Sequence, residues 1–175
     1  MAAVDGTALV VGGSSGIGRA CAEALAAAGW TTRVFDLKPG DEEAAVALDV
    51  RDREAVFAAV GELVETSGEL GTVVYAAGTA RVTAILAVEP KEWDLVLGVN
   101  LTGAFHALQA TAPHIAAGGS FTAISSIDSQ SRSPGWPPTA PRRPGSRRWS
   151  APPRSSSARP ASAPTRSCRG SSARP

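Results

Sequence analysis

The 175-residue chain has few cysteines, few aromatic residues and no long apolar run. Its two cysteines, Cys21 and Cys168, exclude a disulfide-stapled scaffold and favour a reducing compartment, the cytoplasm. No apolar stretch reaches the length of about 18 residues that a membrane-spanning helix needs, so no membrane association is expected. Met1–Thr7 lack the basic and apolar stretches of a secretory signal. No His, Cys, Asp or Glu residues have metal-site spacing, so no metal is expected.

Charge and composition divide the sequence at about residue 130. Residues 1–130 contain 7 Lys and Arg against 16 Asp and Glu, which gives a net charge of −9. Residues 131–175 contain 10 Arg, 10 Pro and 11 Ser, but no acidic residue and no Leu, Ile, Val, Phe or Tyr. Such a segment has too little apolar surface to offset the entropy of ordering the chain. The sequence therefore predicts a folded domain over 1–130 and a disordered Arg/Pro/Ser-rich tail over 131–175.

Short β-like runs alternate with amphipathic helical stretches in the first part. The predicted strands are Thr7–Val11, Thr32–Asp36, Val46–Val50, Thr72–Ala76 and Ser120–Ser125. The predicted helices are Ile17–Ala28, Arg53–Thr66 and Lys91–Ile115, the last closed by Gly118 and Gly119. Alternating strands and helices form parallel βαβ units with helices on both faces of a sheet. The predicted fold is α/β, a truncated Rossmann-type doubly wound sheet with strand order 3-2-1-4-5, and its ligand crevice lies at the carboxyl ends of the strands.

A glycine-rich turn lies where this strand order reverses. Between the first predicted strand and helix, the chain reads Gly12-Gly13-Ser14-Ser15-Gly16-Ile17-Gly18. Gly12 allows a sharp turn, Gly16 lets backbone approach a pyrophosphate, and Gly18 lets the helix pack closely on the strand. The helix N-terminus then offers unpaired N–H groups to the phosphates. The turn predicts a dinucleotide site; an ordinary glycine turn is the alternative.

Asp36 ends the second predicted strand, 18 residues after Gly18. A carboxylate at this point accepts hydrogen bonds from both hydroxyls of the adenosine ribose and repels a 2′-phosphate, so NAD is favoured over NADP. Two nearby cations, Arg33 and Lys38, weaken that exclusion. The alternative is that Asp36 is a plain turn acid.

Taken with these features, four more motifs resemble the short-chain dehydrogenase/reductase family, and the resemblance covers residues 5–130. The matching motifs are the turn Gly12–Gly18, the acid–aliphatic pair Asp49-Val50 that holds adenine, Ala76-Ala77-Gly78 in place of the family's N-A-G, the proton-relay residue Asn100, and the catalytic serine Ser126. The resemblance implies an oxidoreductase that transfers hydride between a nicotinamide cofactor and a small alcohol or carbonyl substrate. It also implies assembly as a homodimer or homotetramer through two long helices.

The family's catalytic Tyr and Lys are missing from this sequence. The resemblance places that Tyr 13 residues after Ser126, where the chain has Thr139, and the Lys four residues later, at Arg143. The only tyrosine is Tyr75. Arg143 cannot serve as a base, because a guanidinium stays protonated in proteins. The chain as written is predicted to bind a dinucleotide without useful turnover.

The change in composition suggests the hypothesis of a one-base loss near the codons for Gln130–Arg132, which a sequencing or cloning error or a real frameshift would produce. In the shifted frame the codons permit Tyr at position 139 and Lys at position 143. They also permit Asn-Ala-Val-Leu-Pro-Gly over Thr165–Gly170, which matches a segment of the same family.

Two alternative functions remain for the chain as written. It could be a dinucleotide-binding pseudoenzyme, or its tail could be a basic arm that binds nucleic acid or an acidic partner. The scattered arginines, without a repeated dipeptide, do not favour a nucleic-acid partner.

Overall fold

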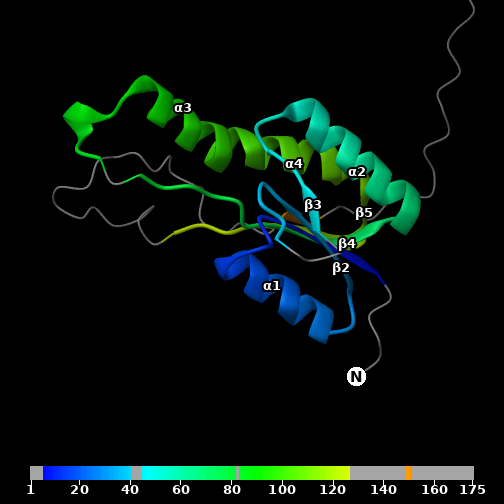
Figure 1. The fold of residues 1–175 in the computed structure, drawn as a ribbon. Coiled ribbons are helices and arrows are strands. Elements are labelled where there is room, and N and C mark those ends of the chain that lie inside the picture. The colour runs from blue at the N-terminus through cyan, green and yellow to red at the C-terminus, as the bar shows by residue number, and fades with distance from the viewer. Residues whose placement is uncertain (1–5, 41–44, 82, 127–148, 151–175) are drawn as a thin grey trace, which may run out of the picture.

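A sheet of six strands organises the part of the chain that the structure describes. This computed structural model describes residues 6–40, 45–81, 83–126 and 149–150, with only the backbone at residues 85, 149 and 150. The strands are β1 (Thr7–Val11), β2 (Thr31–Asp36), β3 (Ala45–Ala47), β4 (Leu70–Tyr75), β5 (Ile115–Ala123) and β6 (Trp149–Ser150). Their order is β3-β2-β1-β4-β5-β6 (Figure 1). The first five strands are parallel, which confirms the predicted order 3-2-1-4-5.

Helices cover both faces of this sheet. They are α1 (Gly16–Ala27), α2 (Arg53–Ser67), α3 (Pro90–Leu97) and α4 (Gly103–Thr111), with short 3-10 turns η1 (Ile85–Ala87) and η3 (Ala112–His114) and the π-helical turn η2 (Gly98–Thr102). The helix α1 lies on one face, and α2 and α4 lie together on the other (Figure 1). No helix in the described ranges combines the length and apolarity that crossing a bilayer requires.

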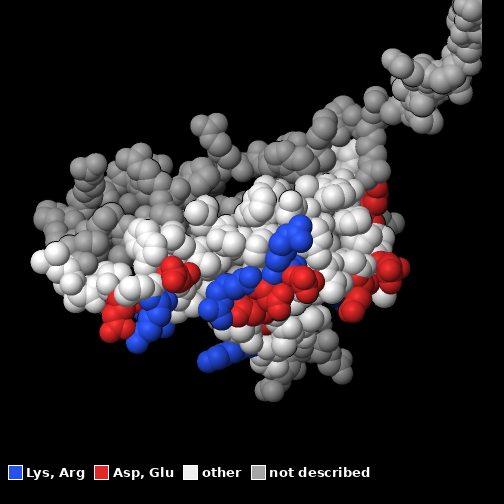
Figure 2. All heavy atoms as spheres, turned by 90° about the horizontal axis from the view of Figure 1, so that it is seen from above, with Lys and Arg blue, Asp and Glu red and all other residues white. Residues whose placement is uncertain are grey.

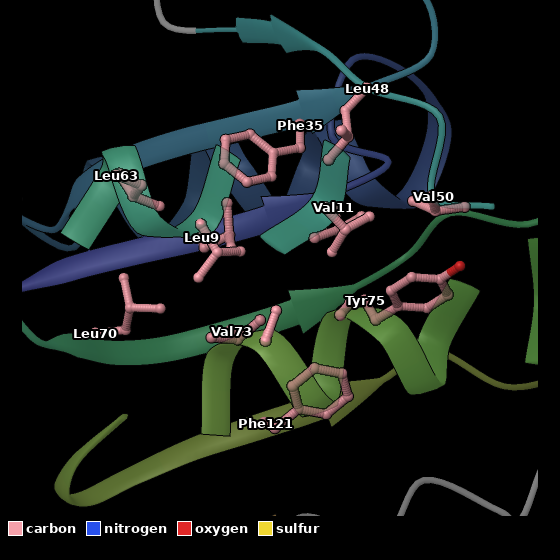
Figure 3. Packing of buried hydrophobic residues seen from close by; sticks show 14 of the residues in the cluster. Leu9, Val11, Phe35, Leu48, Val50, Leu63, Leu70, Val73, Tyr75 and Phe121 are labelled. Carbon is pink, nitrogen blue, oxygen red and sulfur yellow. The ribbon is translucent and has the colours of Figure 1, made fainter. Parts of the chain in front are cut away.

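The main hydrophobic core lies between the sheet and the α2–α4 layer. Alternate residues of β1, β4 and β5 point into it, and Figure 3 shows their side chains: Leu9, Val11, Val73, Tyr75 and Phe121. A smaller cluster of Val10, Ala22, Val34 and Val74 packs beneath α1. The strand β1 is therefore buried on both faces, as parallel strands between helical layers usually are.

The predicted helix Lys91–Ile115 corresponds to an unbroken helical segment formed by α3, η2, α4 and η3. Two details differ: the segment widens to a π-helical turn around Asn100, and it ends at His114, where β5 begins. Pro113 in the last turn has no N–H to continue an α-helix. Gly118, taken as part of the helix stop, lies inside β5 with a φ of 81°. The pairing of β4 with β5 shifts register over this stretch.

Two other predictions need correction. The third strand ends at Ala47 rather than Val50, because the following residues turn: the Asp52 N–H donates to the Asp49 carbonyl over 3.0 Å. Within the tail expected to lack structure, Trp149–Ser150 forms β6 and pairs antiparallel with β5. An outer strand presents unpaired backbone groups, to which an extended segment can add. The remaining tail predictions lie outside the described residues.

Candidate functional site

The glycine turn joins β1 to α1 at the carboxyl edge of the sheet. Gly12 has a φ of 82°, and a Cβ there would overlap the backbone of Ala77. A Cβ at Gly18 would overlap the carbonyl of Gly12, so α1 begins directly against the turn. Ser15 is the N-cap of α1, but its side chain makes no capping hydrogen bond. The first N–H groups of α1 are thus left to other acceptors, as an anion-binding helix N-terminus requires.

Asp36 at the end of β2 is held by the backbone around it. The Ser14 N–H donates to its Oδ2 over 3.0 Å, and the Lys38 N–H donates to its Oδ1 over 2.9 Å. The Ser14 hydroxyl donates to the Pro39 carbonyl over 3.2 Å, which ties the glycine turn to the segment after β2. The Asp36 carboxylate is half-buried and fixed beside the turn, with further lone pairs able to accept hydrogen bonds.

Asp49 and Arg51 form an ion pair after β3. The Nη2 of Arg51 lies 2.6 Å from the Oδ2 of Asp49, and its Nε lies 3.0 Å from each carboxylate oxygen. The side-chain hydrogen bonds from Arg51 hold the pKa of Asp49 below its usual value, against the opposing effect of partial burial. Sequence reasoning missed Arg51; a base two residues after the acid was the available signal. The pair fixes Asp49 as an ionised acceptor.

Asn100 joins the long helical segment to the chain after β4. Its Oδ1 accepts from the Thr79 N–H over 2.9 Å, and its Nδ2 donates to the Thr79 carbonyl over 2.7 Å. The N–H groups of Ala76 and Ala77 both donate to the Val11 carbonyl, at 2.8 and 2.9 Å. Together these bonds fix the segment from Ala76 to Thr79 next to the glycine turn.

Ser126 follows β5 and is exposed. Its neighbour Ser125 has a buried hydroxyl with no hydrogen-bond partner in the described part of the chain. Tyr75 is fully buried in the core, and its hydroxyl donates to the Val99 carbonyl over 2.5 Å. Tyr75 therefore cannot take the place of a catalytic tyrosine. Thr139 and Arg143 lie outside the described residues.

A cavity of about 530 Å³ opens at the carboxyl ends of the strands, a volume typical of small-molecule sites. Most of the residues singled out from the sequence line it: Gly12, Ser15, Gly16, Ile17, Gly18, Asp36, Asp49, Val50, Ala76, Ala77 and Gly78. Ser14, Asn100 and Ser126 do not line it, although Ser14 bonds Asp36 and Asn100 bonds the lining residue Thr79. The lining also includes several residues that sequence reasoning missed, among them Arg51, Thr79, Arg81, Leu95 and Val99.

Charges of both signs lie on the face covered by α2, α3 and α4, where Figure 2 shows Lys and Arg side chains next to Asp and Glu side chains. The described residues form three ion pairs: Arg51–Asp49 after β3, Lys91–Glu89 at the start of α3, and Arg19–Glu23 on α1, which covers the opposite face of the sheet. In the described ranges no group of three His, Cys, Asp or Glu side chains could hold a metal ion.

Comparisons with known proteins agree on one family. The family model described as short chain dehydrogenase matches residues 6–139. The short-chain reductase protein NovJ of Streptomyces niveus is 36% identical over 124 residues, which are 63% of this chain and 47% of that protein. Sorbitol dehydrogenase of Cereibacter sphaeroides is 30% identical over 138 residues, 73% of this chain and 54% of that protein. The chain thus spans about half the length of the curated relatives it matches.

A solved structure shows the same fold. Carveol dehydrogenase from Mycobacterium avium, in complex with NAD, superposes with a TM-score of 0.68 at 26% identity. The match covers 75% of this chain and 58% of that one.

Proposed function

Because the chain belongs to the short-chain dehydrogenase family, whose members bind nicotinamide dinucleotides, we propose that the cavity at the carboxyl ends of its strands binds NAD. The observation that carries the proposal is the Asp36 carboxylate, held 3.0 and 2.9 Å from two backbone N–H groups beside the glycine turn. A carboxylate fixed in this way accepts hydrogen bonds from both ribose hydroxyls. It also opposes a 2′-phosphate, so NAD is preferred over NADP.

The residues around the cavity fit the parts of such a cofactor. The N-terminal N–H groups of α1 are not capped by Ser15 and suit a pyrophosphate. A Cβ at Gly12 would overlap the backbone of Ala77, and a Cβ at Gly18 would overlap the carbonyl of Gly12, so both positions need glycine for these segments to lie so close together. The ion-paired Asp49 and the adjacent Val50 offer a fixed edge for the adenine ring.

Hydride transfer needs more than this binding site. A bound dinucleotide would supply nicotinamide C4 as the donor or acceptor of a hydride for the carbon of an alcohol or carbonyl group. The substrate oxygen must then lose or gain a proton, which calls for a general acid/base near neutral pH. Ser126 can donate a hydrogen bond to that oxygen, but Tyr75 is buried and engaged. Without the family's Tyr and Lys, the chain as written binds the dinucleotide as a pseudoenzyme and does not turn over.

The sequence itself supports a frameshift as the origin of this loss. Residues 131–175 carry 10 Arg and no acidic residue, whereas residues 1–130 have a net charge of −9. A shifted frame permits Tyr at position 139, Lys at position 143 and a Pro-Gly segment in one register. Resequencing the coding DNA from the codon for Ser125 to that for Gly145 tests this directly. One extra base near Ser131 supports a frameshift and predicts an active reductase or dehydrogenase; an unchanged sequence refutes it.

Binding is tested by fluorescence titration of the 175-residue chain with NADH and NADPH. We expect NADH to bind more tightly. Asp36→Asn should reduce the NADH-over-NADPH preference by about tenfold or more, since hydrogen bonds to a charged acceptor are lost. Asp94→Asn, at an exposed acid of α3, is the matched control and should leave the preference unchanged. A chain that binds neither nucleotide, or an unaltered preference in Asp36→Asn, contradicts the proposal.

A further inference from the structure

A histidine on α4 bonds the backbone of the segment assigned to adenine. His106 is 8% exposed, and its Nδ1 lies 3.0 Å from the Val50 carbonyl oxygen. A carbonyl oxygen only accepts hydrogen bonds, so Nδ1 carries the hydrogen and donates it. The two residues are 56 positions apart, and nothing in the spacing of the sequence signals the contact.

The same helix holds Val50 at a second point. A Cβ built on Gly103 would lie 2.6 Å from Cγ2 of Val50, so the backbone of α4 runs directly against that side chain. Gly103 and His106 are three residues apart and share one face of the helix. Val50, which is 7% exposed, is thus held through its side chain and through its carbonyl.

The turn around Val50 leaves one donor for a ligand. The Asp52 N–H donates to the Asp49 carbonyl, and the Arg51 N–H donates to the Asp49 carboxylate, each over 3.0 Å. The Val50 N–H makes no hydrogen bond within the described ranges, although Val50 lines the cavity. Backbone N–H groups of nearly buried residues are almost always paired, so a donor in this position calls for an acceptor beyond the described residues, such as a ligand in the cavity that Val50 lines.

We propose that His106 is a positioning residue for recognition of the adenine base, acting through the backbone of Val50. The proposal rests on the proposed function, dinucleotide binding in the cavity. By fixing the carbonyl of Val50, His106 limits rotation of this residue and directs its N–H at a ring-nitrogen acceptor of adenine. Beside it, the Asp49 carboxylate accepts from the 6-amino group. Hypoxanthine carries N–H and C=O at the corresponding atoms, so the same arrangement opposes it.

The test compares NADH with reduced nicotinamide hypoxanthine dinucleotide, which differs only in the base. Fluorescence titration of the full chain gives both affinities and their ratio. We expect the wild-type chain to prefer NADH and His106→Leu to reduce that preference about three- to tenfold, as loss of one aimed hydrogen bond does. His106→Asn keeps a donor at the position of Nδ1 and should restore the preference.

A matched control separates positioning from general loosening of α4. Thr111 is fully buried on the same helix, and its hydroxyl bonds the Ala107 carbonyl within that helix. Thr111→Val should therefore leave the ratio unchanged even if it lowers stability. If His106→Leu weakens both dinucleotides equally, His106 has only a structural role and the inference is overturned.

Three further outcomes decide whether His106 positions Val50 for recognition of adenine. If His106→Leu does not fold, His106→Asn is compared with His106→Gln, whose amide lies one bond farther from the backbone. Equal preferences in those two variants overturn the inference, since the position of the donor would not matter. A wild-type chain that binds neither dinucleotide refutes the proposed function and this inference with it. A wild-type chain that binds both equally refutes only the inference.

Discussion

Replacing Gly103 by Ala tests how tightly α4 is packed against the site. The new Cβ would lie 2.6 Å from Cγ2 of Val50 and 2.7 Å from the hydroxyl of Tyr75, well inside normal contact distance. Neither neighbour can retreat easily, because Tyr75 is fully buried and bonds the Val99 carbonyl. Overpacking of this kind costs about 1–3 kcal/mol, offset by about 1 kcal/mol from the better helix propensity of Ala. We expect Gly103→Ala to lower the free energy of unfolding by up to about 2 kcal/mol.

Gly61 provides the matched control for the same chemical change. It lies inside α2, and a Cβ there would meet nothing within 4 Å. Only helix propensity should act, so Gly61→Ala should raise the free energy of unfolding by about 0.5–1 kcal/mol. Urea unfolding followed by circular dichroism measures both variants. If the two substitutions shift the midpoint in the same direction, the close packing of α4 on Val50 and Tyr75 is refuted.

Two further predictions follow from the hydrogen bonds of the site. Tyr75→Phe should lower the free energy of unfolding by about 1–2 kcal/mol in urea melts, because the Val99 carbonyl loses its donor, while leaving the NADH affinity unchanged. Arg51→Met should raise the pKa of the Asp49 carboxyl in an NMR titration, because Arg51 lowers it through hydrogen bonds. With a folded pKa below the ordinary 3.8, the pair stabilises the protein above that pH and stops doing so as the pH falls through the lowered value. An unchanged Asp49 pKa, or loss of NADH binding in Tyr75→Phe, would count against this reasoning.

The parts of the fold that depend on local patterns could be predicted from the sequence. The bounds of β1 match the prediction, and the alternation of strands and helices fixes the strand order. The π-helical turn within the long helix could not be predicted, since it accompanies contacts between Asn100 and Thr79, 21 positions apart. The amphipathic period runs through η2 and gives no sign of the wider turn. Gly118 was misread for a similar reason, because a glycine after apolar helical spacing predicts a helix end as readily as an irregular strand.

The candidate site likewise combines features that local spacing predicts with contacts that the sequence does not reveal. The glycine turn and Asp36 are set by spacing along one strand–turn–helix unit, and the structure brings both to the cavity. The bond between His106 and Val50 joins distant segments, so it can be found only when the helix is seen packed on the loop. The pairing of Asp49 with Arg51 is local, yet a sequence does not say whether a neighbouring base bonds the acid or faces solvent.

These contacts separate dinucleotide binding from hydride transfer along the chain. The segment around Val50 is fixed by Gly103 and His106, and the segment after β4 is fixed by Asn100 through Thr79. All of these residues precede residue 127, so the contacts that hold the proposed adenine side of the cavity come from the described part of the chain before the tail. The proton-transfer groups of the family, in contrast, would come from positions 139 and 143. Under the proposed function, a frameshift near residue 131 would remove turnover and leave the proposed adenine contacts in place. An NADH titration that shows binding, combined with an assay of the same sample that shows no turnover, is the expected result.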